Sequence, residues 1–400
     1  MWLTAPLHTL LGRTFIIIAT ATSLLFLLTG IIPYQQQQQQ QLLQQLHYFN
    51  TVEAGREGEC IDYDQSENTI TINYNTSFLD VVQTINDPDV IDNLVGREYI
   101  LKANLEVDDG VTFEMTSSSS NGDGGLQYLK IAGENGIIVH GRILIDGVKI
   151  TSWDTSSNDI VQQNSDGSIR RAYIQFDESE GSQIINSDFG YLGYQEFGRR
   201  GFDLFGGGEP SHDMEIRGSK FHDMWFAFYS RGAYNIVVDG NEYYNNIKYA
   251  LDPHSGTHDM DITNNWLHHN PIGAICSDRC SNILIEGNRA EHNTKAGIFF
   301  SRNMHDSIAR NNYIYNTTTG IIVSESPNNE IYSNTIEGAT SAGIRLSNPP
   351  NPDDGFTEDN HVYNNTISNS EDGIREIRSD GNILEDNKFF NIESDDDDND

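Results

Sequence analysis

Residues 297–336 read GIFFSRNMHDSIARNNYIYNTTTGIIVSESPNNEIYSNTI, and two apolar segments of this stretch, GIFFS (297–301) and GIIVS (320–324), resemble each other closely. An Asn precedes a short apolar run at positions 241, 265, 288, 312, 334, 365 and 387, with gaps of 24, 23, 24, 22, 31 and 22 residues. A small residue recurs with nearly the same spacing as this Asn, at Ala227, Ala250, Gly273, Gly297, Gly320, Gly343 and Gly373. The chain is therefore an array of repeats.

The apolar runs of these repeats are short and alternate with period two, which argues against helical repeats. Coils of roughly 22–24 residues with small residues, Asn and β-branched strands predict an all-β fold, a right-handed parallel β-helix. We expect it to extend from about residue 95 to 392, with early strands at 99–103, 136–140 and 142–146. We expect insertions between 152 and 208. The repeated Asn residues should stack in one turn as an amide ladder, which gives them a structural role.

The composition allows one elongated domain or two compact ones, and the formal net charge of −35 argues against a nucleic-acid partner. A polyanionic substrate would need a local basic patch on such a protein. We expect four regions: 1–34 as a membrane anchor or signal segment, 35–58 as a Gln-rich linker, 59–393 as a catalytic β-helix, and 394–400 as a disordered acidic tail. We expect a monomer.

Residues 14–34 carry almost no charge and are preceded by Arg13, which predicts a segment that enters or crosses a membrane and leaves the rest outside the cytoplasm. We favour a retained anchor over a cleaved signal peptide, because the apolar run is long and ends without a small-x-small site. The Asn-x-Ser/Thr sequons at Asn75, Asn316 and Asn364 would then be open to glycosylation.

Three cysteines, Cys60, Cys276 and Cys280, exclude a disulfide framework. Cys276 falls at the repeat position that holds Phe300 and Val323 in later coils, which predicts a small buried hydrophobe. Metal binding by Cys276 and Cys280 is the alternative.

The segment GNEYYNNIKYALDPHSGTH (240–258) sets Tyr249, Asp252 and His254 within six residues. Strand alternation directs Leu251 inward and Asp252 and His254 outward. Strict alternation would turn Tyr249 inward, so we expect it on the outer strip only if the strand starts at Ala250 and Tyr249 belongs to the turn. From the spacing alone, the triplet is either a set of hydrogen-bonded surface residues or an acid–base cluster. The outward strip continues on neighbouring coils through Tyr229, Arg231, Ser277, Phe299, Ser301 and Arg302.

The wording YALDPH (249–254) closely resembles the signature of the mannuronan C5-epimerases, and GNEY (240–243), TSWD (151–154) and YLGY (191–194) resemble further segments of that family in the same order. The resemblance extends from about residue 60 to 392. Two positions depart from the family pattern: Ala250 stands where Gly is usual, and Ser255 stands where an acidic residue is usual.

This resemblance implies an extracytoplasmic isomerase that inverts C5 of β-D-mannuronate or a related uronate within an acidic polysaccharide. His254 would be the base and Tyr249 the acid, because epimerisation needs proton transfer on both faces of the sugar. The substrate would be bound by Asp252, Arg231, Arg279, Arg302 and His258.

No EF-hand or nonapeptide calcium repeat is present, and we predict neither a catalytic metal nor another cofactor. Two alternatives to the epimerase stay open: a polysaccharide lyase that uses the same site, and a non-catalytic carbohydrate-binding β-helix.

Overall fold

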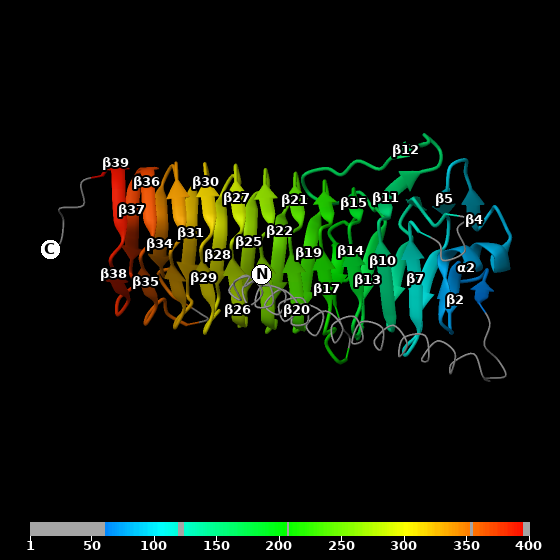
Figure 1. Cartoon of the computed structure of the whole chain (residues 1–400), viewed down its shortest axis with the longest axis horizontal. Coiled ribbons are helices and arrows are strands. Elements are labelled where there is room, and N and C mark those ends of the chain that lie inside the picture. The colour runs from blue at the N-terminus through cyan, green and yellow to red at the C-terminus, as the bar shows by residue number, and fades with distance from the viewer. Residues whose placement is uncertain (1–60, 119–123, 206–207, 353–354, 395–400) are drawn as a thin grey trace, which may run out of the picture. The chain divides into compact units, whose positions relative to one another are not determined.

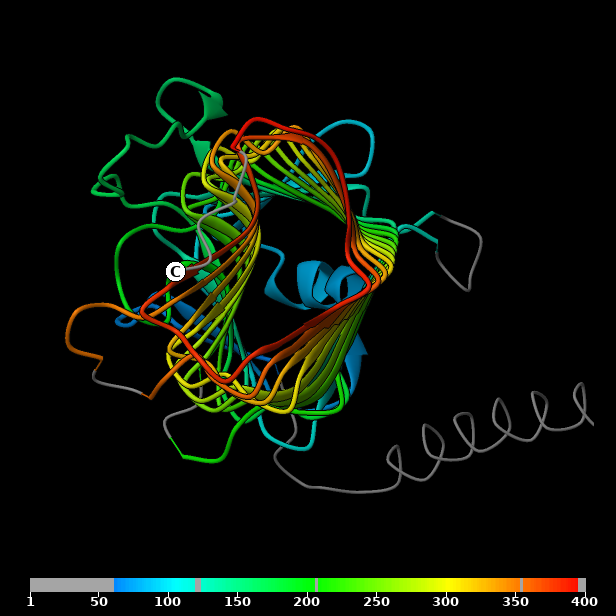
Figure 2. The same cartoon turned by 90° about the vertical axis from the view of Figure 1, so that its left-hand side faces the viewer.

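Three sheets run along the described part of the chain, which comprises residues 61–118, 124–205, 208–352 and 355–394 of the computed structural model. These residues belong to one unit, Cys60–Asp400. Each coil contributes one strand to each sheet, and the coils superimpose when the unit is viewed end-on (Figures 1 and 2).

The first sheet has 13 strands, in the order β1 (Asp62–Asp64), β2 (Thr69–Ile72), β6 (Asn104–Val107), β9 (Gly136–Val139), β13 (Tyr173–Phe176), β16 (Gly201–Leu204), β19 (Phe226–Arg231), β22 (Tyr249–His254), β25 (Ile272–Ser277), β28 (Ala296–Ser301), β31 (Thr319–Ser324), β34 (Ala342–Ser347) and β37 (Asp372–Ile377). The second sheet has 12 strands, in the order β3 (Thr76–Ser77), β7 (Thr112–Thr116), β10 (Arg142–Asp146), β14 (Gln183–Ile185), β17 (Glu215–Arg217), β20 (Tyr234–Asp239), β23 (His258–Thr263), β26 (Ser281–Glu286), β29 (Ile308–Arg310), β32 (Glu330–Tyr332), β35 (His361–Tyr363) and β38 (Ile383–Glu385).

The third sheet has 14 strands, in the order β4 (Ile91–Asn93), β5 (Glu98–Leu101), β8 (Tyr128–Ala132), β11 (Lys149–Asp154), β15 (Asp188–Gly190), β18 (Lys220–His222), β21 (Glu242–Tyr244), β24 (Trp266–His268), β27 (Arg289–Glu291), β30 (Tyr313–Tyr315), β33 (Thr335–Glu337), β36 (Thr366–Ser370) and β39 (Lys388–Ile392), with β12 (Asp159–Ile160) paired to β11. Pairing is parallel throughout the described residues except at β1–β2, β4–β5 and β11–β12.

The predicted parallel β-helix is confirmed, as are the early strands β5, β9 and β10. The stack begins earlier than residue 95, one of the two predicted starts, but within the region 59–393 assigned to the β-helix domain, because β2 and β3 already pair with β6 and β7 of the next coil. The Asn and small-residue markers used to find the repeat do not occur in this first coil.

The Asn ladder forms in the turn between the second and third sheets. The Asn265 amide nitrogen donates to the Val238 carbonyl (2.9 Å) and to Asn288 Oδ1 (3.0 Å), while Asn265 Oδ1 accepts from the Asn241 backbone N–H (2.9 Å). The pattern repeats to Asn387. Buried backbone groups of the turn are thereby satisfied in each coil, which confirms the predicted structural role.

Further amide ladders, which the sequence analysis did not identify, line other turns of the coil. Asn246, Asn270 and Asn293 stack before the strands of the first sheet, and Asn329 and Asn360 stack before those of the second. The first of these ladders lies directly upstream of β22. It therefore fixes where the strand with the candidate acid–base residues begins.

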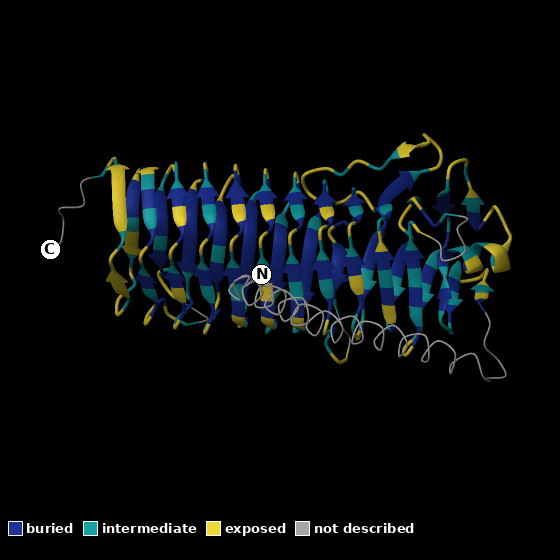
Figure 3. Cartoon of the chain, in the orientation of Figure 1, coloured by how far each residue is buried: buried dark blue, intermediate teal, exposed yellow. Residues whose placement is uncertain are grey.

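The interior is filled by apolar side chains, and Figure 3 shows how many residues of the stacked strands are buried. Phe189, Phe221 and Tyr243 stack with nearly parallel rings, at centroid distances of 5.0 and 4.8 Å. Cys276 is fully buried and pairs in register with Phe300, so the predicted small hydrophobe is confirmed.

Helix α2 (Phe78–Ile85) lies at the N-terminal end of the stack and starts with a capping box between Ser77 and Asp80. Its buried residues Phe78 and Val81 cover the core there (Figure 2). The expected membrane segment 14–34, the linker 35–58 and most of the acidic tail lie outside the described residues. Within the described ranges no helix is both long and apolar enough to cross a bilayer.

Candidate active site

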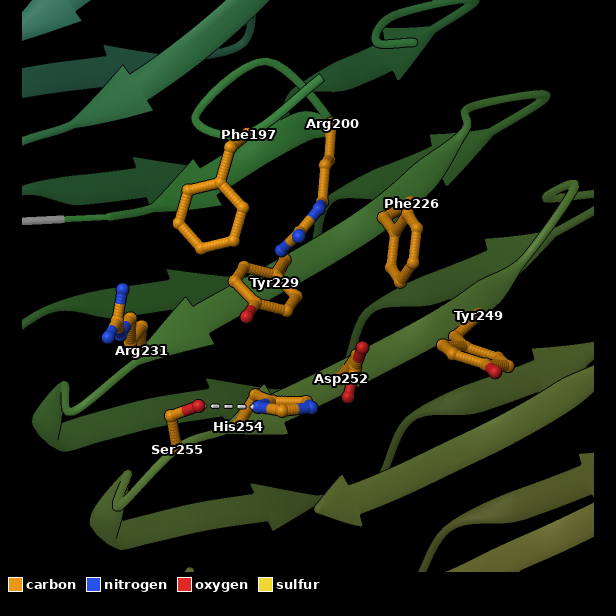
Figure 4. A pocket seen from close by; sticks show the side chains of 9 residues that line it. All are labelled: Phe197, Arg200, Phe226, Tyr229, Arg231, Tyr249, Asp252, His254 and Ser255. Atoms are coloured by element: carbon orange, nitrogen blue, oxygen red, sulfur yellow. Dashed lines mark hydrogen bonds between the residues drawn. The ribbon is translucent and has the colours of Figure 1, made fainter. Parts of the chain in front are cut away.

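A pocket of about 500 Å³ opens on the outer face of the first sheet, over β19 and β22. It is lined by Phe197, Arg200, Phe226, Tyr229, Arg231, Tyr249, Asp252, His254 and Ser255 (Figure 4). Four predicted site residues therefore lie together on two neighbouring coils: Arg231, Tyr249, Asp252 and His254. Parallel register places Tyr229 beside Asp252 and Arg231 beside His254.

Tyr249 reaches this outer face because the strand breaks strict alternation at its second residue. Ala250 and Leu251 are both fully buried in the core, so the residues on either side of them, Tyr249 and Asp252, both face outward. This repeat position has little room: at the equivalent Gly297 even a Cβ would lie 2.7 Å from the Ile314 side chain, whereas Ala250 accommodates one in the core. A small residue here lets two consecutive residues face inward, and Tyr249 lines the pocket.

A hydrogen-bond relay fixes the orientation of His254. The Ser255 hydroxyl donates to Asp278 Oδ2 (3.0 Å) and lies 2.7 Å from His254 Nδ1. Since the hydroxyl proton is committed to the carboxylate, Ser255 Oγ must accept from Nδ1–H. This assigns the tautomer and leaves Nε2 with its lone pair as the basic nitrogen.

The electrostatics of His254 and Tyr249 suit opposite proton-transfer roles. Burial lowers the pKa of His254, with Arg200, Arg302 and Arg231 adding to the effect and Asp278 opposing it, so the imidazole is neutral at pH 7. Burial and the nearby Asp252 raise the pKa of Tyr249, so its phenol keeps the proton. Figure 4 shows the two side chains on either side of Asp252.

Asp252 faces outward, as predicted, but it is 3% exposed because the pocket walls cover it. Burial raises its pKa well above the ordinary value, and its Oδ1 has no hydrogen-bond partner among the described residues. Asp203, beside Tyr229 in the preceding coil, is fully buried, and burial raises its pKa to about 7 despite Arg200. Two weakly acidic carboxyls therefore lie beneath one guanidinium.

Arg200 extends over the pocket from the segment between β15 and β16. Its guanidinium carbon is 3.9 Å from the ring centroid of Tyr229 and 4.4 Å from that of Phe197. Its Nη1 is buried and has no hydrogen-bond partner among the residues that the structure describes, an arrangement that favours an anionic ligand. The sequence analysis missed Arg200, Phe197 and Phe226; the first two lie in an irregular insertion that the repeat alignment does not reach.

The other predicted binding residues lie outside the pocket. Arg279 is exposed and pairs with Asp278 (3.0 Å), so it supports the relay. Arg302 is exposed just after β28, but its charge lowers the pKa of both Tyr249 and His254. His258 belongs to the second sheet, where it stacks on Tyr234 (5.3 Å).

One cluster among the described residues, Glu180, His212 and Asp213, has potential metal-ligand atoms within 4.8 Å of one another. None of the three lines the pocket. The cluster therefore supplies no group to the chemistry considered for this site.

The fold and pocket define a solenoid with a pocket lined by titratable and aromatic side chains on one sheet face. The chain belongs to the right-handed β-helix family, whose model, described as "right handed beta helix region", matches residues 135–305 and 254–395.

Among its curated relatives are the mannuronan C5-epimerases of Pseudomonas putida, 27% identical over 156 residues, and Pseudomonas aeruginosa, 26% identical over 205 residues. These alignments cover 36% and 48% of this chain and only 30% and 36% of the relatives. The resemblance to this family stated from the sequence is thereby confirmed.

A solved structure, the periplasmic alginate epimerase AlgG, has a similar fold. It matches with a TM-score of 0.68 and 19% identity over 80% of this chain and 84% of that chain. At this identity the match supports the shared fold.

Proposed function

We propose that the chain is an extracytoplasmic isomerase that inverts C5 of uronate units within an acidic polysaccharide, with mannuronan as the first substrate to test. The observation that carries the proposal is the pair of proton-transfer groups, a neutral His254 and a protonated Tyr249, flanking a pocket in which Arg200 Nη1 has no hydrogen-bond partner among the described residues. The mannuronan C5-epimerase relatives support the reaction class, and the periplasmic neighbour supports the location.

Neutralising the sugar carboxylate is the first requirement, because removing the C5 proton adds charge to an existing anion. Arg200 is the best-placed group for this role, since its buried Nη1 lacks a protein partner and Arg231 adds a second cation to the pocket. Preorganised donors of this kind typically contribute about 3 kcal/mol to transition-state stabilisation. Burial raises the pKa of Asp252 well above its ordinary value, and in its protonated form this carboxyl can donate a hydrogen bond to the sugar.

His254 Nε2 then takes the C5 proton, and the bonding electrons delocalise into the carboxylate as an enediolate held by Arg200. The imidazolium that forms donates from Nδ1 to Ser255, whose hydroxyl is in turn held by ionised Asp278. The relay therefore stabilises the charged state of the base as well as its orientation.

Tyr249 returns a proton to C5 from the other face, which inverts the centre without net redox change. The phenolate and the imidazolium afterwards exchange with water to restore the starting protonation states. Expulsion of the O4 substituent from the enediolate before this protonation would instead give an unsaturated sugar, the lyase outcome.

The test uses His254→Ala and Tyr249→Phe with polymannuronate in D₂O, followed by proton NMR. Each substitution should lower turnover by about 10²-fold or more, and the wild-type product should carry deuterium at C5. His305→Ala is the matched control, because the His305 ring, like that of His254, hydrogen-bonds to the side chain of the next residue, here Asp306, but lies outside the pocket.

Three results would contradict the proposal. Inverted product without C5 deuterium excludes the two-group scheme. An ultraviolet-absorbing unsaturated product identifies a lyase. Binding of uronans without any turnover indicates a carbohydrate-binding solenoid.

A further inference from the structure

The outer face of the first sheet continues past the pocket for five more strands, and one column of side chains can be followed along it. From Asp252 the register passes to Ile275, Phe299 and Ile322. These three form an outward apolar strip, in which Ile275 and Ile322 are nearly buried and Phe299 is partly exposed. The next two positions of the column are Arg345 and Arg375.

Arg345 has an unsatisfied side chain in this otherwise apolar column. Its Nε is buried without a hydrogen-bond partner, and among the described residues no ion pair to Arg345 is found. Its neighbour in the column is another cation, Arg375, which already pairs with Asp372. Burial and the Arg375 charge both lower the pKa of Arg345. A partly buried guanidinium beside a like charge is stabilised by an added anion.

We propose that Arg345, flanked by Arg375, is a distal carboxylate subsite that holds a uronate unit of the same polysaccharide chain bound at the candidate active site. This inference rests on the proposed function. Four coil steps separate Asp252 from Arg345, which at about 4.8 Å per coil is roughly 19 Å. Since one coil is close to the length of one pyranose unit, the subsite lies about four units from the reacting sugar.

The chemistry between the two sites fits this occupant. Phe299, the partly exposed member of the strip, offers an apolar contact to a sugar ring face, and the strip carries no charge to compete for carboxylates. The column of Ser277, Ser301, Ser324 and Ser347 runs in register beside it, and Ser324 is the most exposed of these serines. On a chain of net charge −35, an unpaired arginine on this face gives a polyanion a local point of attachment.

The test measures Kd by isothermal titration calorimetry for mannuronate oligomers of two lengths, trimers and octamers, with wild type, R345Q and a control. Only the octamer can reach from the pocket to Arg345. R345Q should raise the Kd of the octamer about tenfold relative to wild type. The Kd of the trimer should be nearly the same in R345Q and in wild type. The control is R289Q, which removes the same charge from an exposed side chain of the third sheet.

Equal weakening of trimer and octamer binding, or no weakening of either, would overturn the subsite. If wild type bound no oligomer at all, the proposed function would fail instead, so the two failures are distinguishable. If R345Q did not fold, R345K would replace it, since lysine keeps the charge but loses the planar fork of donors. R345K should weaken octamer binding about threefold, and wild-type octamer affinity in R345K would refute the proposal.

Discussion

Substituting Ser255 tests whether the relay from Asp278 controls the base. In Ser255→Ala the 2.7 Å contact to His254 Nδ1 and the 3.0 Å bond to Asp278 are both lost, so neither the tautomer nor the imidazolium is held. Hydrogen bonds to a charged group contribute about 1.5–3 kcal/mol. Because each 1.36 kcal/mol is a factor of ten in rate, kcat should fall by about 10–100-fold.

The pH dependence of kcat/KM tests the direction in which the relay shifts the pKa of His254. The relay favours the protonated imidazole, so its removal should lower the pKa of His254 further and move the acidic limb of kcat/KM to lower pH. Ser255→Asp, which places an acidic residue directly at Nδ1, should move the limb to higher pH. The assay is turnover of polymannuronate followed by proton NMR, with nitrogen NMR of the imidazole to report the tautomer. Ser281→Ala, outside the pocket, is the control.

An unchanged kcat in Ser255→Ala, or an acidic limb that moves in the same direction in both variants, would refute the relay. The nitrogen spectrum provides a check that needs no activity. Wild type should show the proton on Nδ1, and Ser255→Ala should show a mixture of tautomers.

Two further predictions concern stability. Asn288→Leu removes the donor to the Ile262 carbonyl (2.8 Å) and interrupts the amide ladder, so the free energy of unfolding in urea should fall by about 1–3 kcal/mol; an unchanged midpoint would show that the ladder contributes little. His222 lies between Asp188 (3.0 Å) and Asp223 (2.8 Å), whose hydrogen bonds outweigh burial and raise its pKa from 6.5 to about 9. The folded state favours the charged imidazole, so its contribution to the free energy of unfolding is full below about pH 6.5 and is lost as pH rises through 9. The free energy of unfolding should therefore fall by about 3 kcal/mol over this range, and His222→Gln should abolish the fall.

The repeat determined most of the fold from sequence alone. The Asn period and the small residue set the coil length, and period-two strands of that length bury one face only when they stack. The buried position of Cys276 followed from the same alignment. The first coil did not: the repeat placed the first strands at about residue 95, although the domain bounds 59–393 include β2 and β3, and only the structure shows these strands paired with β6 and β7.

For the candidate site, the sequence identified the residues that are neighbours along one strand or in register across coils: Asp252, His254 and Arg231. It could not identify Arg200, which reaches the pocket from an irregular insertion, or decide that Arg279 pairs with Asp278 and not with the pocket. It also left Tyr249 ambiguous, because alternation is a local rule and the break at Ala250 depends on how tightly the next coil packs. Contacts within the repeat follow from its period, whereas contacts made by insertions and turn side chains exist only once the coils have stacked.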